Sequence, residues 1–230
     1  MPPSPTSPGR ALIFANGTQV DLRALAAMIG PDDYLIAADG GLRHLDALER
    51  LPHLLIGDLD SIDRERIPAL TGEGVRVEQY PVEKDETDLE LAVDAALAAG
   101  CAEVIIAGGL GGRLDMTLAN IFLLEKLRPR VDARLEDGIE EVFLIHGDLD
   151  SPARTIEGRA GDRVSLLALG GPARGVVTEG LAYPLRSETL YPEYARGVSN
   201  VMEGPSAGVA LREGTLICIH TRQTEANNPR

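Results

Sequence analysis

The segment LLIGDLDS at residues 54–61 is a short apolar run that ends abruptly in Gly and Asp. The first half of the chain repeats this pattern as ALIFANG at 11–17, YLIAADGG at 34–41 and VIIAGGLGGRLD at 104–115. Short, continuous apolar runs are typical of strands buried on both faces of a parallel sheet. Since helical patterns lie between the runs, we expect an open, Rossmann-like α/β sheet.

Two of the intervening helices can be placed from the sequence. Thr87 and Glu90 have the spacing of a capping box, so a helix is expected to start near residue 88 and to stop at Gly100. The segment 116–127 is apolar nearly all round, which predicts a buried helix that ends before Pro129 and includes Phe122 in the core.

The second half has a different pattern, in which short β-type runs recur between Gly, Pro and Asp. Examples are EEVFLIHG at 140–147, DRVSLLALGG at 162–171 and TLICIHT at 215–221. This spacing predicts an all-β sandwich domain. We therefore expect a disordered tail at 1–10, an α/β catalytic domain at 11–130, a β-sandwich domain at 131–222 and a disordered tail at 223–230. Residues 131–140 fit either domain.

The composition excludes several classes of partner. The formal net charge is −14, from 22 Lys and Arg against 36 Asp and Glu. Such a chain repels phosphate backbones and anionic lipids, so we expect no nucleic-acid or membrane partner, although a phosphorylated substrate that carries a divalent cation stays open. The N-terminal MPPSPTSPGR lacks the apolar core of a signal peptide, and no apolar run approaches the ~20 residues of a membrane span. With Cys101 and Cys218 as reduced core residues, a cytoplasmic protein is expected.

Carboxylates and glycines gather where the predicted strands end, which is where open parallel sheets bind ligands. The acidic residues at these ends are Asp39, Asp58, Asp60, Asp85, Asp88 and Asp115. Their mutual repulsion calls for a cation, and hard oxygen ligands suit Mg²⁺. Neighbouring glycines would let backbone N–H groups approach a phosphate, with Arg113 beside them. Neither a P-loop nor a standard dinucleotide motif is present. We interpret this half as a Mg²⁺–nucleotide site for phosphoryl-type transfer.

Four ordered motifs of the first half resemble the thiamine pyrophosphokinase family: ADGG at 38–41, GDLDS at 57–61, KDETD at 84–88 and GGLGGRLD at 108–115. Three segments of the second half are similar to the β domain of that family: GDRVSLLAL at 161–169, VVTEGLAYPL at 176–185 and GVSN at 197–200. The resemblance covers about residues 11–220. Its specificity comes from the order of the motifs in two matching halves.

The resemblance implies transfer of the pyrophosphoryl group of ATP to the hydroxyethyl alcohol of thiamine, which gives thiamine diphosphate and AMP with Mg²⁺ as the cofactor. It implies a metal and phosphate site made by Asp39 together with four catalytic carboxylates, Asp58, Asp60, Asp85 and Asp88. The residues implied at the nucleotide are Asn16, Gly40, Gly41, Ser61, Thr87, Gly111, Gly112, Arg113 and Asp115. Ser199 and Asn200 would bind the aminopyrimidine of thiamine. The β domain would bind thiamine and form a homodimer with active sites at the interface.

Two departures from the family pattern keep alternatives open. Met116 stands where the family usually has His, and the chain has no Trp to stack on thiamine, so Tyr183 and Tyr191 are the aromatic candidates. One alternative is a related pyrophosphokinase that acts on a pterin-type alcohol, and another is a non-catalytic sensor that binds nucleotide or thiamine. For single residues the simpler interpretation also stays open: Thr87 or Asp85 could cap a helix. The four histidines share no metal-ligand spacing and are expected to be structural.

Overall fold

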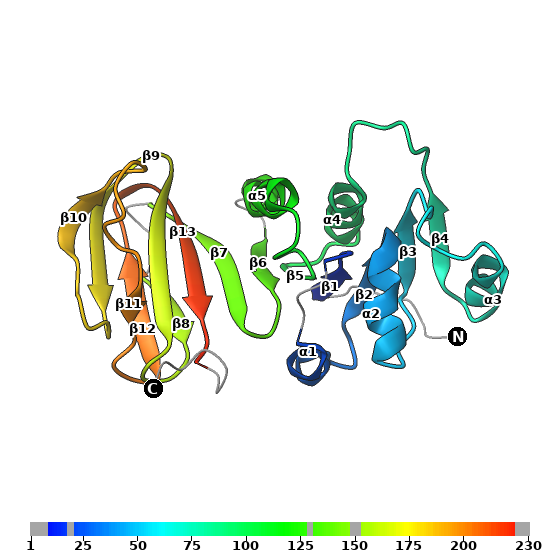
Figure 1. Cartoon of the computed structure of the whole chain (residues 1–230), viewed down its shortest axis with the longest axis horizontal. Coiled ribbons are helices and arrows are strands. Elements are labelled where there is room, and N and C mark those ends of the chain that lie inside the picture. Colours follow the sequence, from blue (N-terminus) through cyan, green and yellow to red (C-terminus); the bar gives the residue numbers. More distant parts are fainter. Residues whose placement is uncertain (1–8, 18–20, 128–130, 148–152, 224–230) are drawn as a thin grey trace. The chain divides into compact units, whose positions relative to one another are not determined.

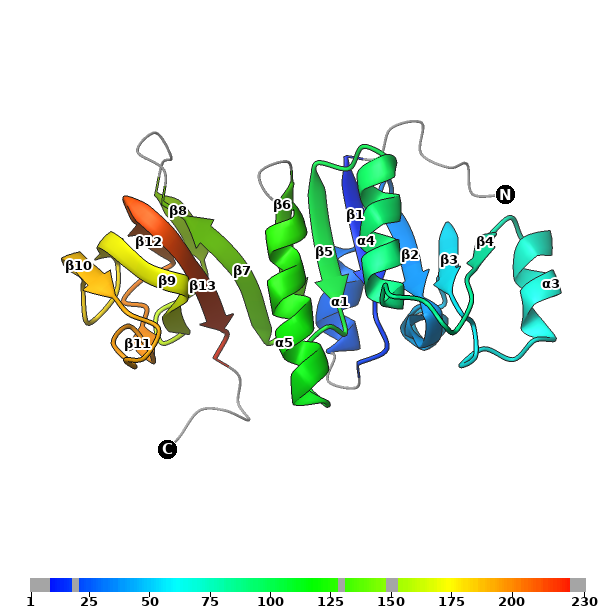
Figure 2. The same ribbon diagram turned by 90° about the horizontal axis from the view of Figure 1, so that it is seen from above.

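The computed structural model describes residues 9–17, 21–127, 131–147 and 153–223, and Figures 1 and 2 show its ribbon. The chain divides into two compact units between Gly138 and Ile139. The first unit alternates strands and helices, and the described part of the second unit contains strands only. These observations confirm an α/β unit followed by a β unit. Among the described helices, none is both long and apolar enough to cross a membrane.

The first unit is built on a parallel sheet with the strand order β4-β3-β2-β1-β5-β6. Its strands are β1 (Arg10–Phe14), β2 (Tyr34–Ala38), β3 (Leu54–Gly57), β4 (Arg76–Gln79), β5 (Glu103–Ala107) and β6 (Asp132–Glu136). The strand order reverses between β1 and β5, because β2 follows β1 on one side while β5 and β6 lie on the other. Such a reversal opens a crevice at the carboxyl ends of the strands, where ligands bind.

Helices cover both faces of this sheet. They are α1 (Leu22–Met28), α2 (Leu42–Ala47), α3 (Arg66–Gly72), α4 (Asp88–Ala98) and α5 (Leu114–Leu123), with 3₁₀ turns η1 (Asp39–Gly41) and η2 (Leu124–Leu127). Figure 1 shows α4 and α5 on one face and α1 and α2 on the other. The strand side chains are therefore buried on both sides: Leu12, Ile13 and Phe14 of β1 are all at most 1% exposed. Burying one such side chain contributes about 1.5–3 kcal/mol.

Helix α5 corrects one prediction. The sequence predicts a helix buried nearly all round, with Phe122 in the core, but Leu114, Leu118 and Phe122 are 72%, 43% and 51% exposed. These positions are four residues apart and share one side of the helix, while Ile121 and Leu123 are buried. An apolar composition on every side does not show which side packs against the sheet.

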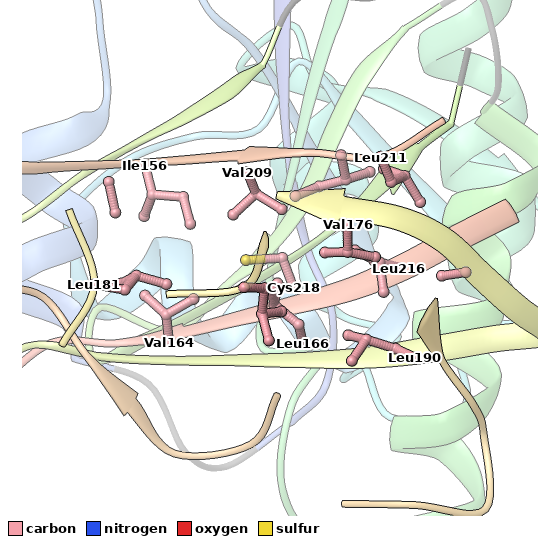
Figure 3. Close-up of a cluster of buried hydrophobic side chains, with 14 of the residues drawn as sticks. Ile156, Val164, Leu166, Val176, Leu181, Leu190, Val209, Leu211, Leu216 and Cys218 are labelled. Atoms are coloured by element: carbon pink, nitrogen blue, oxygen red, sulfur yellow. The ribbon is translucent and has the colours of Figure 1, made fainter. Parts of the chain in front are cut away.

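The second unit consists of antiparallel strands in two sheets. Its strands are β7 (Glu140–His146), β8 (Arg154–Glu157), β9 (Arg163–Glu179), β10 (Arg186–Leu190), β11 (Asn200–Val201), β12 (Ser206–Ala210) and β13 (Glu213–Thr221). The first half of β9 pairs with β13 and β11, and its second half pairs with β10 and β12. Side chains from β8, β9, β12 and β13 point toward one another in the core, as Figure 3 shows for Ile156, Leu166, Val209 and Cys218.

A buried histidine joins two carboxylates in this unit. His220 of β13 is 0% exposed, and its Nδ1 and Nε2 atoms lie 2.9 Å from Glu141 Oε1 and 3.1 Å from Asp162 Oδ2. Burial alone would lower the pKa of His220, but the hydrogen bonds with the two carboxylates outweigh it and raise that pKa. Burial would raise the pKa of Asp162, yet the backbone N–H groups of Gln223 and Arg159, with His220, lower it. This pair ties the last strand to its neighbours, which fits the expected structural role.

The boundaries differ from the predicted ones at three places. The first unit extends to Gly138 rather than to residue 130, because β6 pairs in parallel with β5 and completes the first sheet. Arg10, assigned to the tail, begins β1 and forms an ion pair with Asp33 at 2.8 Å. Gln223, assigned to the other tail, donates its backbone N–H to Asp162. The remaining tail residues, 1–8 and 224–230, lie outside the described residues.

Both cysteines are buried free thiols, as expected. Burial raises the pKa of the Cys101 and Cys218 thiols, so neither is poised as a nucleophile.

Candidate functional site

The carboxyl ends of β1, β2 and β5 open into a cavity of about 560 Å³. It lies where the strand order reverses, so the topology itself positions it. Backbone close to the strand ends and the first turns of α4 and α5 contribute its walls. The lining residues are Ala15, Asn16, Gly17, Ala38, Asp39, Lys84, Thr87, Asp88, Leu89, Gly108, Gly109, Gly111, Gly112, Arg113, Met116 and Asn120.

Three predicted carboxylates come together beside this cavity. Asp39 follows β2, while Asp58 and Asp60 follow β3, and one oxygen of each lies within 4.8 Å of the others. Asp39 is 7% exposed, and its buried Oδ1 atom has no hydrogen-bond partner among the described residues. A buried carboxylate oxygen without a partner is costly unless a cation accompanies it. This donor set of closely spaced, hard oxygens fits Mg²⁺.

Two residues at these strand ends have an unusual backbone conformation that the packing around them stabilises. Asp39 has φ 43° and Leu59 has φ 62°, a region that non-glycine residues seldom adopt. Leu59 is 3% exposed and belongs to the hydrophobic core of the first unit. Because Leu59 is anchored in the core, its neighbours Asp58 and Asp60 are directed to the site from either side.

Gly57 makes room for the acidic side chains. Its φ is +143°, and a Cβ atom there would lie 2.9 Å from Asp88 Cγ and 3.1 Å from Asp39 Cβ. A side chain at residue 57 would therefore displace the carboxylates that the site brings together.

Lys84 is a site residue to which the sequence analysis gave no role. Its side chain is 11% exposed, and its Nζ atom lies 2.9 Å from Asp88 Oδ1 and 3.8 Å from Asp58 Oδ2. The Nζ atom also donates to the Pro81 carbonyl oxygen at 3.3 Å. Burial would lower the pKa of Lys84, but Asp88, Asp58 and Asp39 together raise it. The signal in the sequence was the Lys of KDETD, one of only two lysines in the chain.

Thr87 and Glu90 form the predicted capping box. Thr87 Oγ1 accepts the N–H of Glu90 at 3.2 Å, and Glu90 Oε2 accepts the N–H of Thr87 at 2.8 Å. Helix α4 consequently begins at Asp88, as predicted. The cap places Asp88 in the first turn of α4, beside the cavity.

The turn after β5 offers backbone to a ligand. Gly111 and Gly112 have φ values of 74° and 72°, and both line the cavity. Arg113 also lines it, but its Nη2 atom is 2.6 Å from Asp115 Oδ2 and both side chains are exposed. This contact raises the pKa of Arg113 and lowers that of Asp115. Arg113 thus has a partner that a ligand would have to replace.

The remaining predicted residues lie around the cavity or away from it. Gly40 and Ser61 line a neighbouring hollow of about 490 Å³ that shares Asn16 with the cavity. Gly41 is packed against β1, where a Cβ atom would run into the Phe14 carbonyl group. Asp58 and Asp60 line a third hollow of about 530 Å³, whose apolar residues include Tyr80 and Val82. Asp85 is exposed and, among the described residues, is not part of the close carboxylate group.

Two further residues beside the cavity were not predicted from the sequence. Asn120 of α5 is buried and donates its Nδ2 hydrogen to the Gly109 carbonyl oxygen at 2.8 Å. His44 of α2 lies 2.8 Å through Nε2 from the Gly17 carbonyl oxygen, and burial lowers its pKa. Both contacts fix the backbone at the ends of β1 and β5. They depend on long-range packing, and no local sequence signal predicts them.

In the second unit, Ser199 and Asn200 line a hollow of about 210 Å³ with Tyr183. Asn200 is buried, and its Oδ1 atom accepts the N–H groups of Tyr183 at 3.0 Å and Val201 at 2.9 Å. Its Nδ2 atom donates to the Tyr183 carbonyl oxygen at 2.8 Å. The Asn200 amide therefore links the backbone at Tyr183 to that at Val201 through hydrogen bonds. Beside the same hollow, Ser199 has φ 58° and Tyr183 is 66% exposed.

The fold and the cavity place the chain in the class of α/β proteins whose ligand site lies at the switch point of a parallel sheet. The family model for the thiamin pyrophosphokinase catalytic domain matches residues 25–136, and the model for the vitamin B1 binding domain of thiamin pyrophosphokinase matches residues 154–216. Together the two matches span most of the chain. The chain belongs to the thiamin pyrophosphokinase family.

Individual relatives agree with this assignment. The thiamine pyrophosphokinase of Bacillus subtilis (strain 168) is 28% identical over 174 residues, which are 74% of this chain and 79% of that protein. A crystal structure of thiamine pyrophosphokinase from Bacillus subtilis has a TM-score of 0.82 at 24% identity and covers 94% of this chain and 100% of its own. Thiamin pyrophosphokinase from Candida albicans has a TM-score of 0.76 at 16% identity, with 93% and 89% covered. At these identities the two structures support the fold.

Proposed function

We propose that this chain is a thiamine diphosphokinase, which transfers the pyrophosphoryl group of ATP to the hydroxyethyl alcohol of thiamine and gives thiamine diphosphate and AMP. The observation that carries the proposal is the match of both units, each to the corresponding domain of one enzyme family. The location of the cavity at the switch point supports it, because ATP needs a crevice that exposes backbone N–H groups.

Asp39, Asp58 and Asp60 are the residues that would hold Mg²⁺ in this proposal. When bound, the metal ion would neutralise charge on the phosphate oxygens of ATP and so favour attack on the β-phosphorus. Asp88 would complete the acidic wall of the site from the first turn of α4. Asp85 is exposed, so its predicted metal role is the least supported of the five.

The remaining work of the chain is positioning. Gly111 and Gly112 would present backbone N–H groups to the phosphates, and Arg113 would exchange Asp115 for a phosphate oxygen. Asp58 and Asp60 line the hollow next to the cavity, so their carboxylates are best placed to accept the proton of the attacking alcohol. In-line placement of the alcohol and the leaving AMP is the main source of the rate increase in such transfers.

The second unit, whose two antiparallel sheets support its description as a β-sandwich, would bind thiamine. Ser199 and Tyr183 would contact the aminopyrimidine, and Asn200 would hold their loops in place. Homodimer formation with active sites at the interface belongs to the same proposal. Tyr183, Tyr191, Tyr194 and Val198 are between 40% and 66% exposed, and Tyr183 and Val198 line the same hollow. Such exposed apolar side chains support an assembly that covers them.

The test is ³¹P NMR of the purified chain with ATP, Mg²⁺ and thiamine. AMP and a thiamine diphosphate signal should appear together, and a parallel sample with a pterin-type alcohol should stay unchanged. Turnover of the pterin alcohol alone would favour the related pyrophosphokinase. Intact ATP together with bound thiamine would favour the non-catalytic sensor, and reversion of Met116 to His would then be the first change to make. The cytoplasmic location stays a prediction.

A further inference from the structure

Lys84 is an unusual cation for this chain. The sequence contains 22 Lys and Arg residues, and only Lys84 and Lys126 are lysines. Lys126 lies on the surface, where it pairs with Asp94 at 2.9 Å and is 41% exposed. Lys84 is 11% exposed and lies inside the acidic site. A lysine ammonium is a compact point charge, whereas a guanidinium is planar and broad, so the site uses the smaller of the two cations.

The surroundings of Lys84 define what the ammonium does. Its Nζ atom contacts Asp88 Oδ1 at 2.9 Å and Asp58 Oδ2 at 3.8 Å, and it donates to the Pro81 carbonyl oxygen. Asp58 is itself a member of the close carboxylate group with Asp39 and Asp60. The ammonium therefore lies at the edge of the group of oxygens that suits a divalent cation. It shares a carboxylate with that group and adds a positive charge close to it.

We propose that Lys84 is a built-in counter-cation of the aspartate cluster, which weakens the binding of a lone divalent cation and makes the metal site depend on the nucleotide. The inference rests on the proposed function for the identity of the nucleotide. A metal ion that enters alone meets the field of Lys84 and competes with it for Asp58. A metal ion that enters with ATP brings phosphate oxygens, which offer Lys84 another anion along the wall of the same cavity.

The first test measures binding of Mn²⁺ alone to the nucleotide-free full chain, by the EPR signal of the free ion. The variant Lys84→Met removes the charge and keeps the aliphatic stem, so Mn²⁺ should bind about tenfold more tightly, equivalent to about 1.4 kcal/mol. Lys84→Arg, which keeps the charge, should stay close to the parent chain. Lys126→Met is the matched control, because it removes the other lysine from a surface ion pair, and it should change nothing. Equal or weaker Mn²⁺ binding by Lys84→Met would overturn the proposal.

The second test needs no change at residue 84. In a ¹⁵N-lysine-labelled Lys126→Arg chain, Lys84 is the only lysine and gives a single ammonium signal. Mg²⁺ added alone should shift this signal in step with metal binding, because the ion competes for Asp58. Metal binding that leaves the Lys84 signal unmoved would refute a shared site. Both tests are read without turnover, so failure of thiamine pyrophosphorylation in the NMR assay and failure of this inference remain distinct results.

Discussion

Gly57 is the position at which a single methyl group tests the architecture of the site. In Gly57→Ala, the new Cβ atom would lie 2.9 Å from Asp88 Cγ and 3.1 Å from Asp39 Cβ, at a backbone φ of +143°. The unfavourable φ costs about 1–3 kcal/mol, and overpacking adds about 1–3 kcal/mol. The free energy of unfolding of the first unit should therefore fall by about 2–6 kcal/mol. The loss is about 2 kcal/mol if the Asp88 carboxylate turns away from the new Cβ atom, with about 1 kcal/mol each from the unfavourable φ and from overpacking. The Asp39 Cβ atom cannot turn away, because it is fixed to its own backbone, so some overpacking remains.

Urea unfolding followed by circular dichroism measures this loss, and amide hydrogen exchange assigns it to the peptides of β2 and β3. Activity should fall with stability, since a displacement of about 1 Å at a reacting centre can cost about 10²-fold in rate. The matched control is Gly72→Ala, at the end of α3, where nothing lies within 4 Å of the added Cβ atom. That variant should gain about 0.5–1 kcal/mol. If Gly57→Ala unfolds at the same urea concentration as the parent chain, the close approach of Asp39 and Asp88 does not require glycine at residue 57.

Three further variants test the site and the second unit. Asp60→Asn keeps the shape of the side chain but removes a carboxylate from the cluster, so turnover should fall at least about 10²-fold. Calorimetry in the absence of nucleotide should show unchanged thiamine binding. Full activity of the variant would contradict the assignment of Asp60 as a metal ligand. Asn200→Ala leaves the N–H groups of Tyr183 and Val201 without their acceptor, so thermal unfolding should show a loss of about 1–3 kcal/mol, and an unchanged melting temperature would contradict this linking role. Since the pKa of His220 is raised on folding, its contribution to stability is complete below about pH 6.5 and is lost as pH rises through the folded value. The urea midpoint of the parent chain should fall as the pH is raised above about 6.5, and the midpoint of His220→Gln should not change with pH. A parent midpoint that does not change with pH would refute the argument.

The alternation of apolar runs and helices was sufficient to predict the first unit. Runs such as those at 11–14 and 104–107 are buried on both faces, so the sequence pattern and the packing coincide. The end of that unit was not predictable in the same way. β6, Asp132–Glu136, has a partly exposed strand pattern like those of the second half, and only its parallel pairing with β5 assigns it to the first sheet. Pairing between distant segments leaves no local signal.

The site was predictable as a set of residue types at strand ends, and less so as a set of contacts. The ends of parallel strands meet at one edge, so Asp39, Asp58 and Asp60 had to be near one another. Which other carboxylates join them depends on the cap of α4, which turns Asp88 inward and leaves Asp85 exposed. The ion pair of Arg113 with Asp115 lies at the exposed start of α5, where the two side chains are 75% and 65% exposed.

The backbone strain of the site lies outside what residue types can indicate. Positive φ is expected at glycine, and several glycines of the chain have it, but Asp39 and Leu59 have it as well. Nothing local favours a leucine at φ 62°, so the surroundings must impose it. Burial of the Leu59 side chain in the core supplies the stabilisation, since a buried leucine contributes about 1.5–3 kcal/mol against a strain of about 1–3 kcal/mol. In the Asp-Leu-Asp sequence a core residue thus stands between two carboxylates. The hydrophobic effect holds Leu59 in the core, and the strained turn that this requires directs Asp58 and Asp60 toward Asp39.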